Sequence, residues 1–160
     1  MPTDTALVTV IEAAAVLACA LSGMIAAADK RMDIVGTYVL AALTAFGGGT
    51  LRDLLPERRP FFWVSYWQYL LVILALAVIV VYSRRAFDLA RDLSRRAALV
   101  DALGLALFSL TGVIFSLQAA LPLFIAPILG VVTGTFGGVL RDIVVNEIPE
   151  IFRPGPLYAI

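Results

Sequence analysis

A Gly-Gly-x-Leu-Arg-Asp string occurs twice in this chain, at residues 48–53 and 137–142. The two copies align without a gap both upstream and downstream of the string when 89 is added to each number in the first copy. The aligned pairs outside the string include Glu12 with Asp101, Thr44 with Thr133, and Pro60 with Pro149. Because chance agreement over so long a register is improbable, we interpret the chain as an internal duplication.

The composition indicates that these repeats lie in a membrane. Hydrophobic residues make up 61% of the chain and the mean hydropathy is +0.96, whereas ordinary soluble domains contain roughly 45–50% apolar residues. Five apolar runs are each long enough for a helix that crosses the hydrocarbon core, which takes about 20 residues. Short alternating segments typical of a barrel are absent from the sequence. We therefore predict an all-α polytopic membrane helix bundle, with spans at 6–28, 34–55, 61–82, 97–117 and 121–145.

Three spans fall in the first copy, so the second copy must enter the membrane from the opposite face. The two three-helix repeats are therefore expected to be inverted about a pseudo-two-fold axis in the membrane plane. We assign residues 1–82 to the first repeat, 83–96 to a cytoplasmic linker and 97–160 to the second repeat. The alignment places the start of a sixth helix near residue 155, so we expect either a second repeat truncated in its third helix or a C-terminal remainder outside this sequence.

The distribution of basic residues predicts the orientation. Lys30 and Arg31 and the arginines of the linker lie on one side, and by the positive-inside rule this side is cytoplasmic and the N-terminus is outside. The linker is also expected to form a surface helix, with Phe87, Ala90 and Leu93 on one face. Its arginines would suit anionic lipid headgroups, although they would equally serve as topology determinants alone. They are Arg84, Arg85, Arg91, Arg95 and Arg96.

Most enzymatic chemistry is disfavoured by the residue content. The chain has no histidine and one cysteine, which removes histidine-based nucleophile activation, histidine metal sites and disulfide frameworks. No phosphate-binding loop or dinucleotide fingerprint is present. We therefore expect a membrane protein that is not an enzyme, with no cofactor, no metal site and no nucleic-acid partner.

Glycines cluster at the repeated string, as Gly47, Gly48 and Gly49 in the first copy and Gly137 and Gly138 in the second. Each costs a helix about 1 kcal/mol relative to alanine. One explanation is close helix packing through small residues. The other is a kinked or broken helix whose carbonyls face a water-filled path. Because the glycines recur in an inverted copy, we predict kinks or lost helical hydrogen bonds at both sites.

Polar side chains surround these glycines. The hydroxyls of Thr44 and Thr133 lie next to the expected breaks, either facing the path or bonding back to their own helices. Arg52 follows about 27 Å along a straight helix that starts at Ile34, near the membrane boundary. Its neighbour Asp53 could form an interfacial ion pair with it or a charged vestibule beside the path. The equivalent second pair is Arg141 and Asp142, and Glu12 and Asp101 are expected to partner the two arginines or to form cation-attracting mouths.

The inverted repeats, the doubled string at the ends of the second and fifth helices and the outside N-terminus resemble prokaryotic trimeric intracellular cation (TRIC) channels, a family also described as glycine transporters. The resemblance covers essentially the whole chain. It implies a seven-helix protomer in a homotrimer, in a bacterial inner membrane. It also implies a path for potassium and other monovalent cations through each protomer, lined by the kinked second and fifth helices. This sequence departs from the pattern at Phe136, which stands where the first copy has Gly47.

Two other functional classes stay open from the residues. A secondary transporter of glycine or another small zwitterion would need a closed binding site between alternating gates. The expected breaks lie near helix C-termini, whose carbonyl ends favour cations rather than a substrate carboxylate. We therefore favour the channel. An inert structural membrane protein would show no flux at all.

Overall fold

The computed structural model describes residues 5–93 and 97–153, and every regular element in these ranges is helical. The predicted all-α membrane bundle is confirmed. Four helices are long and apolar enough to cross a membrane, or five if α4 and α5 form one bent span. The helices are α1 (Thr5–Asp29), α2 (Ile34–Leu54), α3 (Phe62–Ser65), α4 (Gln68–Tyr82), α5 (Arg84–Leu93), α6 (Ala97–Gln118) and α7 (Ile125–Val144), followed by the 3-10 turn η2 (Glu150–Phe152).

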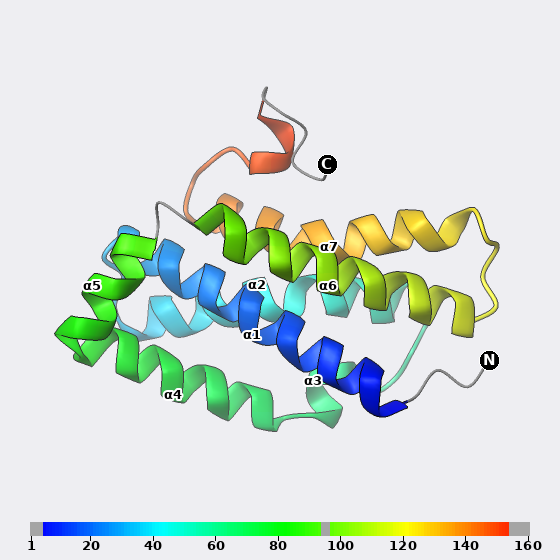
Figure 1. Ribbon diagram of the computed structural model, residues 1–160, viewed down its shortest axis with the longest axis horizontal. Coiled ribbons are helices and arrows are strands. Elements are labelled where there is room, and N and C mark those ends of the chain that lie inside the picture. Colours follow the sequence, from blue (N-terminus) through cyan, green and yellow to red (C-terminus); the bar gives the residue numbers. More distant parts are fainter. Residues whose placement is uncertain (1–4, 94–96, 154–160) are drawn as a thin grey trace.

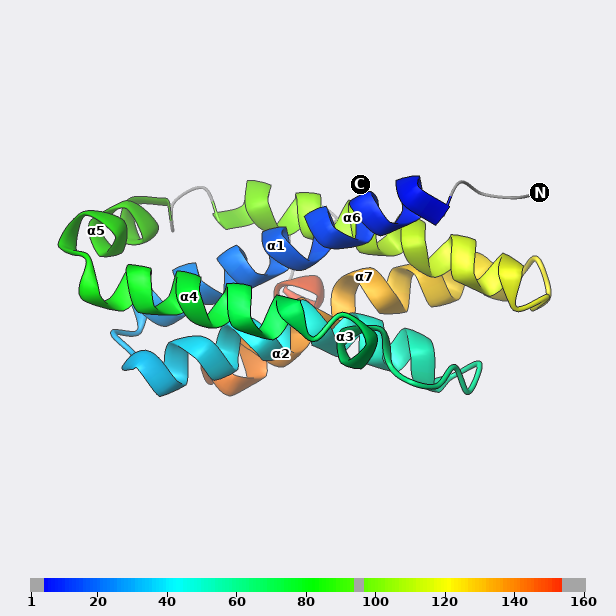
Figure 2. The ribbon, with the colours of Figure 1, turned by 90° about the horizontal axis from the view of Figure 1, so that it is seen from below.

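The four long helices form the centre of the bundle. α1 packs against α2 and α6, and α7 packs against the same two helices. Along the chain α1 and α6 run in opposite directions, as do α2 and α7, so each helix is antiparallel to its counterpart in the other repeat (Figure 1). Viewed from below, α1 and α6 lie above α2 and α7 (Figure 2). This antiparallel arrangement is the one expected of inverted repeats.

The turns that end the helices also occur in pairs. The described non-glycine residues with positive φ are Arg31 (54°), Glu57 (55°), Ala120 (55°) and Asn146 (59°), and they form two pairs at the 89-residue offset. After α1, the amide of Met32 donates to the carbonyl of Ala27, and after α6 the amide of Leu121 donates to that of Ser116. Such left-handed residues close helix C-termini by satisfying carbonyls that have no partner in the helix. The duplication therefore extends to backbone conformation.

The third predicted span, 61–82, was wrong as a single helix. The chain forms the short α3, turns at Tyr66 and Trp67, and then continues as α4. The amide of Phe62 donates to Oδ2 of Asp53 at 2.8 Å, and the Phe62 ring packs beside Gly49. This anchoring fixes the start of α3 against α2, so the chain must turn before α4 can run back along the bundle.

The linker forms a surface helix, as predicted. α5 is bent by 100° from α4, and both Phe87 and Ala90 pack against Ile25 and Ala28 near the end of α1. Arg84 and Arg85 are exposed. The predictions for the side chains of Arg91 and Leu93, for Arg95 and Arg96, and for the start of a sixth helix near residue 155 fall outside the described residues.

The predicted helix breaks at the glycines are wrong, while a kink in a continuous helix stays a prediction. α2 is continuous through residues 47–49 and α7 is continuous through 137–138. In a membrane interior, a backbone group freed from its helix has no water partner, so an intact helix is favoured unless something else satisfies that group. The two helices instead use the glycines to approach each other.

The contact at this crossing is between backbones. A Cβ placed on Gly48 would lie 2.0 Å from the carbonyl oxygen of Thr133, and one on Gly137 would lie 2.3 Å from that of Thr44. Real side chains do not tolerate such distances, so only glycine fits at either position. The alternative of close packing therefore explains these two residues.

Alanine substitution distinguishes the glycines that the helix contact requires from those that have room for a side chain. We expect Gly48→Ala and Gly137→Ala each to lower stability by about 1–3 kcal/mol, because the added methyl meets backbone that cannot move away cheaply. Gly138→Ala is the matched control, since its Cβ would lie 3.7 Å from the nearest heavy atom and alanine favours the helix. Thermal unfolding of the purified protein in detergent measures the difference. Equal unfolding temperatures for all three variants would contradict this packing account.

Candidate functional site

Arg52 lies fully buried near the end of α2, between two carboxylates. Its Nη1 is 2.7 Å from Oε1 of Glu12 on α1, and its Nη2 is 2.8 Å from Oδ1 of Asp53. Its Nε also donates to Oδ1 of Asp53, at 2.9 Å. Removing a guanidinium from water is costly, so such burial requires close pairing. The expected partnership of Glu12 with Arg52 is confirmed.

An aromatic ring from the second repeat completes this cluster. Phe115 of α6 lies between two guanidinium groups, with its ring centre 4.3 Å from the Cζ of Arg52 and 4.2 Å from that of Arg58. Arg58 also lies 3.8 Å from Oδ1 of Asp53. Cation–π contacts of this kind are stronger where a charge is desolvated, as Arg52 is. The ring therefore ties α6 to the end of α2.

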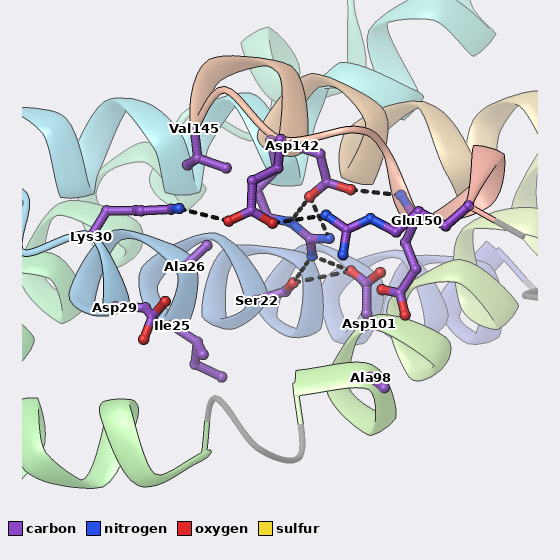
Figure 3. A pocket seen from close by; sticks show the side chains of 13 residues that line it. Ser22, Ile25, Ala26, Asp29, Lys30, Ala98, Asp101, Asp142, Val145 and Glu150 are labelled. Atoms are coloured by element: carbon purple, nitrogen blue, oxygen red, sulfur yellow. Dashed lines mark hydrogen bonds and ion pairs between the residues drawn. The ribbon is translucent and has the colours of Figure 1, made fainter. Parts of the chain in front are cut away.

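Arg141 builds the equivalent cluster at the opposite end of the bundle. Its Nη1 lies 2.6 Å from Oδ1 of Asp101 on α6, and its Nη2 lies 2.8 Å from Oδ1 of Asp142. Ser22 of α1 joins the repeats here, because its hydroxyl accepts from Arg141 and donates to Oδ1 of Asp101 at 3.0 Å. Ser22, Asp101 and Asp142 converge on this point in Figure 3. Oδ2 of Asp101 is buried without a hydrogen-bond partner among the described residues.

Both aspartates of the repeated string also hold the segment that follows their helix. Oδ2 of Asp53 accepts from the amide of Phe62, and Oδ2 of Asp142 accepts from the amide of Glu150 at 3.0 Å. One carboxylate thus pairs with an arginine through one oxygen and anchors the returning chain through the other. The Arg-Asp pair therefore has a structural role at the end of both α2 and α7.

Each cluster faces a cavity. The Arg52 cavity has a volume of about 340 Å³ and is lined by Asp53, Arg58 and Phe115 besides Arg52 itself. The Arg141 cavity has a volume of about 160 Å³ and is drawn in Figure 3. Its charged lining residues are Asp29, Lys30, Asp101, Arg141, Asp142, Glu147, Glu150 and Arg153. That these cavities serve as charged vestibules stays a prediction. No described residues form a metal-binding cluster in them or elsewhere.

The linings of the two cavities differ at five aligned positions, which include Gln118 against Asp29 and Ala119 against Lys30. Phe115 corresponds to Ala26, and Arg58 corresponds to Glu147. Glu147 accepts from Lys30 Nζ at 2.6 Å and from Arg153 Nη2 at 2.9 Å. These contacts lower the pKa of Glu147, while the hydrogen bond to Glu147 raises that of Lys30. Because the pKa of Glu147 is lowered by folding, its contact stabilises the fold above the unfolded pKa, and this stabilisation is lost as the pH falls through the folded pKa. Because the pKa of Lys30 is raised, its contribution is lost only as the pH rises through that raised pKa. The contact is thus fully charged at neutral pH.

The threonines beside the glycine crossing bond to their own helices. Oγ1 of Thr44 donates to the carbonyl of Leu40 at 2.7 Å, and Oγ1 of Thr133 donates to that of Leu129 at 2.6 Å. The back-bonding alternative is therefore confirmed. Both threonines are buried, and each hydroxyl packs against a glycine of the preceding helix, Gly23 or Gly112.

Sequence reasoning missed one residue and one triad in these clusters. Phe115 gave no signal, because its counterpart Ala26 is small and uncharged and an aromatic residue in an apolar run is unremarkable. The triad of Lys30, Glu147 and Arg153 was also missed, since it joins two connections far apart in sequence. The sequence signal for it was that all three residues differ from their aligned counterparts, which are Ala119, Arg58 and Val64.

Removing one buried arginine leaves its carboxylates unpaired. We expect Arg52→Met to destabilise the protein by about 3–5 kcal/mol, because Glu12 and Asp53 would stay buried without a partner. Arg141→Met should cost less, since side-chain exposure is 9% there and 0% at Arg52. Thermal unfolding in detergent measures both. Adding Glu12→Gln to Arg52→Met should recover part of the loss, and a double variant no more stable than the single would argue against this pairing.

The chain matches a family model described as glycine transporter over residues 9–85 and 98–160. It is 38% identical to the UPF0126 membrane protein of Vibrio cholerae, over 94% of this chain and 62% of that protein. It is also 38% identical to the UPF0126 inner membrane protein YadS of Escherichia coli K12, over 84% of this chain and 64% of that one. The chain thus spans less than two thirds of the length of these relatives.

Solved structures share the fold. The TRIC trimeric intracellular cation channel orthologue from Rhodobacter sphaeroides superposes with a TM-score of 0.85 at 36% identity, covering 96% of this chain and 77% of that one. A prokaryotic TRIC channel solved in 0.5 M KCl gives a TM-score of 0.79 at 26% identity, covering 91% and 74%. The resemblance stated from the repeated string is confirmed. The chain belongs to the UPF0126 family of integral membrane proteins, described as glycine transporters, and has the fold of the prokaryotic TRIC cation channels.

Proposed function

We propose that this protein forms a potassium-permeable path for monovalent cations through each protomer, which joins the Arg52 cavity to the Arg141 cavity. The observation that supports it most is the pair of buried arginine–carboxylate clusters, each beside a cavity at opposite ends of one helix crossing. Charged groups at membrane depth usually face an aqueous cavity or the bundle interior. The names of the similar TRIC structures agree with this proposal.

The helix crossing is closed in this conformation. Gly48 and Gly137 leave no room for even a methyl group between α2 and α7. A potassium ion therefore cannot pass at that point, and conduction requires the two helices to move apart there. Thr44 and Thr133 contribute their carbonyls to the crossing, and their hydroxyls pack against Gly23 and Gly112 on the neighbouring helices. In this proposal the glycines line the path at a closed contact and do not break the helices.

The proposal also covers the orientation of the protomer in the membrane, its lipid contacts and its assembly. By the positive-inside rule Lys30 and the arginines of α5 face the cytoplasm, and the N-terminus lies outside. Exposed Arg84 and Arg85 on α5 then meet the headgroup region, where they would attract anionic lipids. Assembly is proposed to be trimeric, as in the R. sphaeroides orthologue.

A secondary transporter for glycine or another small zwitterion is the second candidate, and the description of the family model favours it. Such transporters bind a substrate carboxylate at the N-termini of broken helices near the midplane. Both α2 and α7 are unbroken, so the described residues offer no such half-helix terminus. The cation path therefore fits the observed backbone better.

Flux in liposomes distinguishes these functions. We expect the purified protein to carry potassium down its gradient, because both cavities hold carboxylates, and to leave labelled glycine excluded. Protein-free liposomes give the baseline for both solutes. Saturable glycine uptake with little potassium flux would favour the transporter, and a baseline rate for both solutes would contradict the proposed path.

A further inference from the structure

The two cavities carry different charge, although the repeats that build them are related. The Arg141 cavity is lined by five acidic and three basic side chains, a formal charge of −2. The Arg52 cavity is lined by Arg52, Arg58 and Asp53, a formal charge of +1. That cavity is neutral when Glu12, which pairs with Arg52, is counted. One end of the bundle is therefore acidic and the other is not.

Arg58 and Glu147 account for most of the net difference, because the changes from Gln118 to Asp29 and from Ala119 to Lys30 cancel in charge. Where the first repeat has Arg58, the second has Glu147, and each lines its own cavity. Both side chains are held in place. Arg58 lies over the Phe115 ring at 4.2 Å and 3.8 Å from Asp53, and Glu147 is held by Lys30 and Arg153. Exchanging the two residues would reverse the charge pattern of the cavities.

We propose that the Arg58–Glu147 exchange makes the path rectify, with cations entering more readily from the Arg141 cavity than from the Arg52 cavity. An acidic vestibule raises the local concentration of cations and a basic one lowers it, so current is larger when cations start from the acidic side. This inference rests on the proposed cation path. Screening weakens the effect as salt rises, because the Debye length falls from about 30 Å at 0.01 M to about 3 Å at 1 M.

Currents of reconstituted protein in planar bilayers test this. For the wild type we expect the ratio of potassium currents at equal and opposite voltages to reach about twofold or more in 10 mM KCl and to approach one in 1 M KCl. Arg58→Glu makes both cavities acidic, so it should raise the low-salt conductance and bring the ratio towards one. Glu147→Arg should lower the low-salt conductance and also remove the rectification.

The double variant Arg58→Glu with Glu147→Arg is the most direct test, because it should restore the rectification that both single variants lose, but in the opposite direction. Arg59→Glu is the matched control. It makes the same charge change beside Arg58, but Arg59 stacks on Phe61 and does not line the cavity. It should therefore change the ratio less than Arg58→Glu does.

The outcomes separate this inference from the function on which it rests. A wild type that conducts equally in both directions at 10 mM would overturn the inference and leave the cation path intact. Equal effects of Arg58→Glu and Arg59→Glu, or single variants that conduct and rectify like the wild type, would overturn it as well. A wild type without potassium conductance would contradict the cation path itself.

Discussion

Two buried guanidinium groups determine how this bundle is assembled. Arg52 and Arg141 lie near the ends of α2 and α7, and each must find carboxylates because an unpaired buried charge is far more costly than a paired one. Glu12 on α1 and Asp101 on α6 supply them from neighbouring helices at 2.7 and 2.6 Å. These pairs fix the register of α1 against α2 and of α6 against α7. The repeated acidic position and the repeated string are therefore parts of one interaction.

The glycine crossing depends on that register. Gly48 can meet Thr133 and Gly137 can meet Thr44 only if α2 and α7 are placed symmetrically, and the ion pairs hold both helices at their far ends. The close contact of α2 with α7 also joins the Arg52 cluster and the Arg141 cluster within one bundle. Small residues at such interfaces gain packing between helices, which offsets their low helix propensity. The ion pairs at the helix ends and the glycines at the crossing therefore stabilise the same arrangement of α2 and α7.

Much of this arrangement could be read from the sequence. The doubled string predicted inverted repeats, and the acidic residues that recur upstream of it predicted the partners of both arginines. The conformation at the glycines could not be predicted, because a glycine cluster suits both a broken helix and a close contact. Which one forms depends on the facing helix, and the alignment alone did not show that Thr133 lies opposite Gly48. Phe115 was unpredictable for a similar reason, since its importance comes from two arginines that lie on another element.

The turn between α3 and α4 shows the same limit. Hydropathy predicted one span over 61–82, because Tyr66 and Trp67 are as compatible with a membrane helix as with a turn at its boundary. The deciding contacts are those of Phe62 with Asp53 and Gly49, which are tertiary. Local pattern therefore predicted the rough extent of the apolar segments, but not how many helices they form. Side-chain and backbone contacts between repeats decided how they end.

The central claim is that cations pass between α2 and α7 where their crossing opens, and cysteine accessibility tests it most directly. In a Cys19→Ala background, which removes the one native thiol, Thr133→Cys places a thiol at the crossing. Val131→Cys, on the same helix but 51% exposed on the outside of the bundle, is the control. The account predicts that a cationic methanethiosulfonate reagent reduces potassium flux through Thr133→Cys and leaves Val131→Cys unaffected. Undiminished flux through Thr133→Cys after complete labelling, or loss of flux only in Val131→Cys, would contradict it.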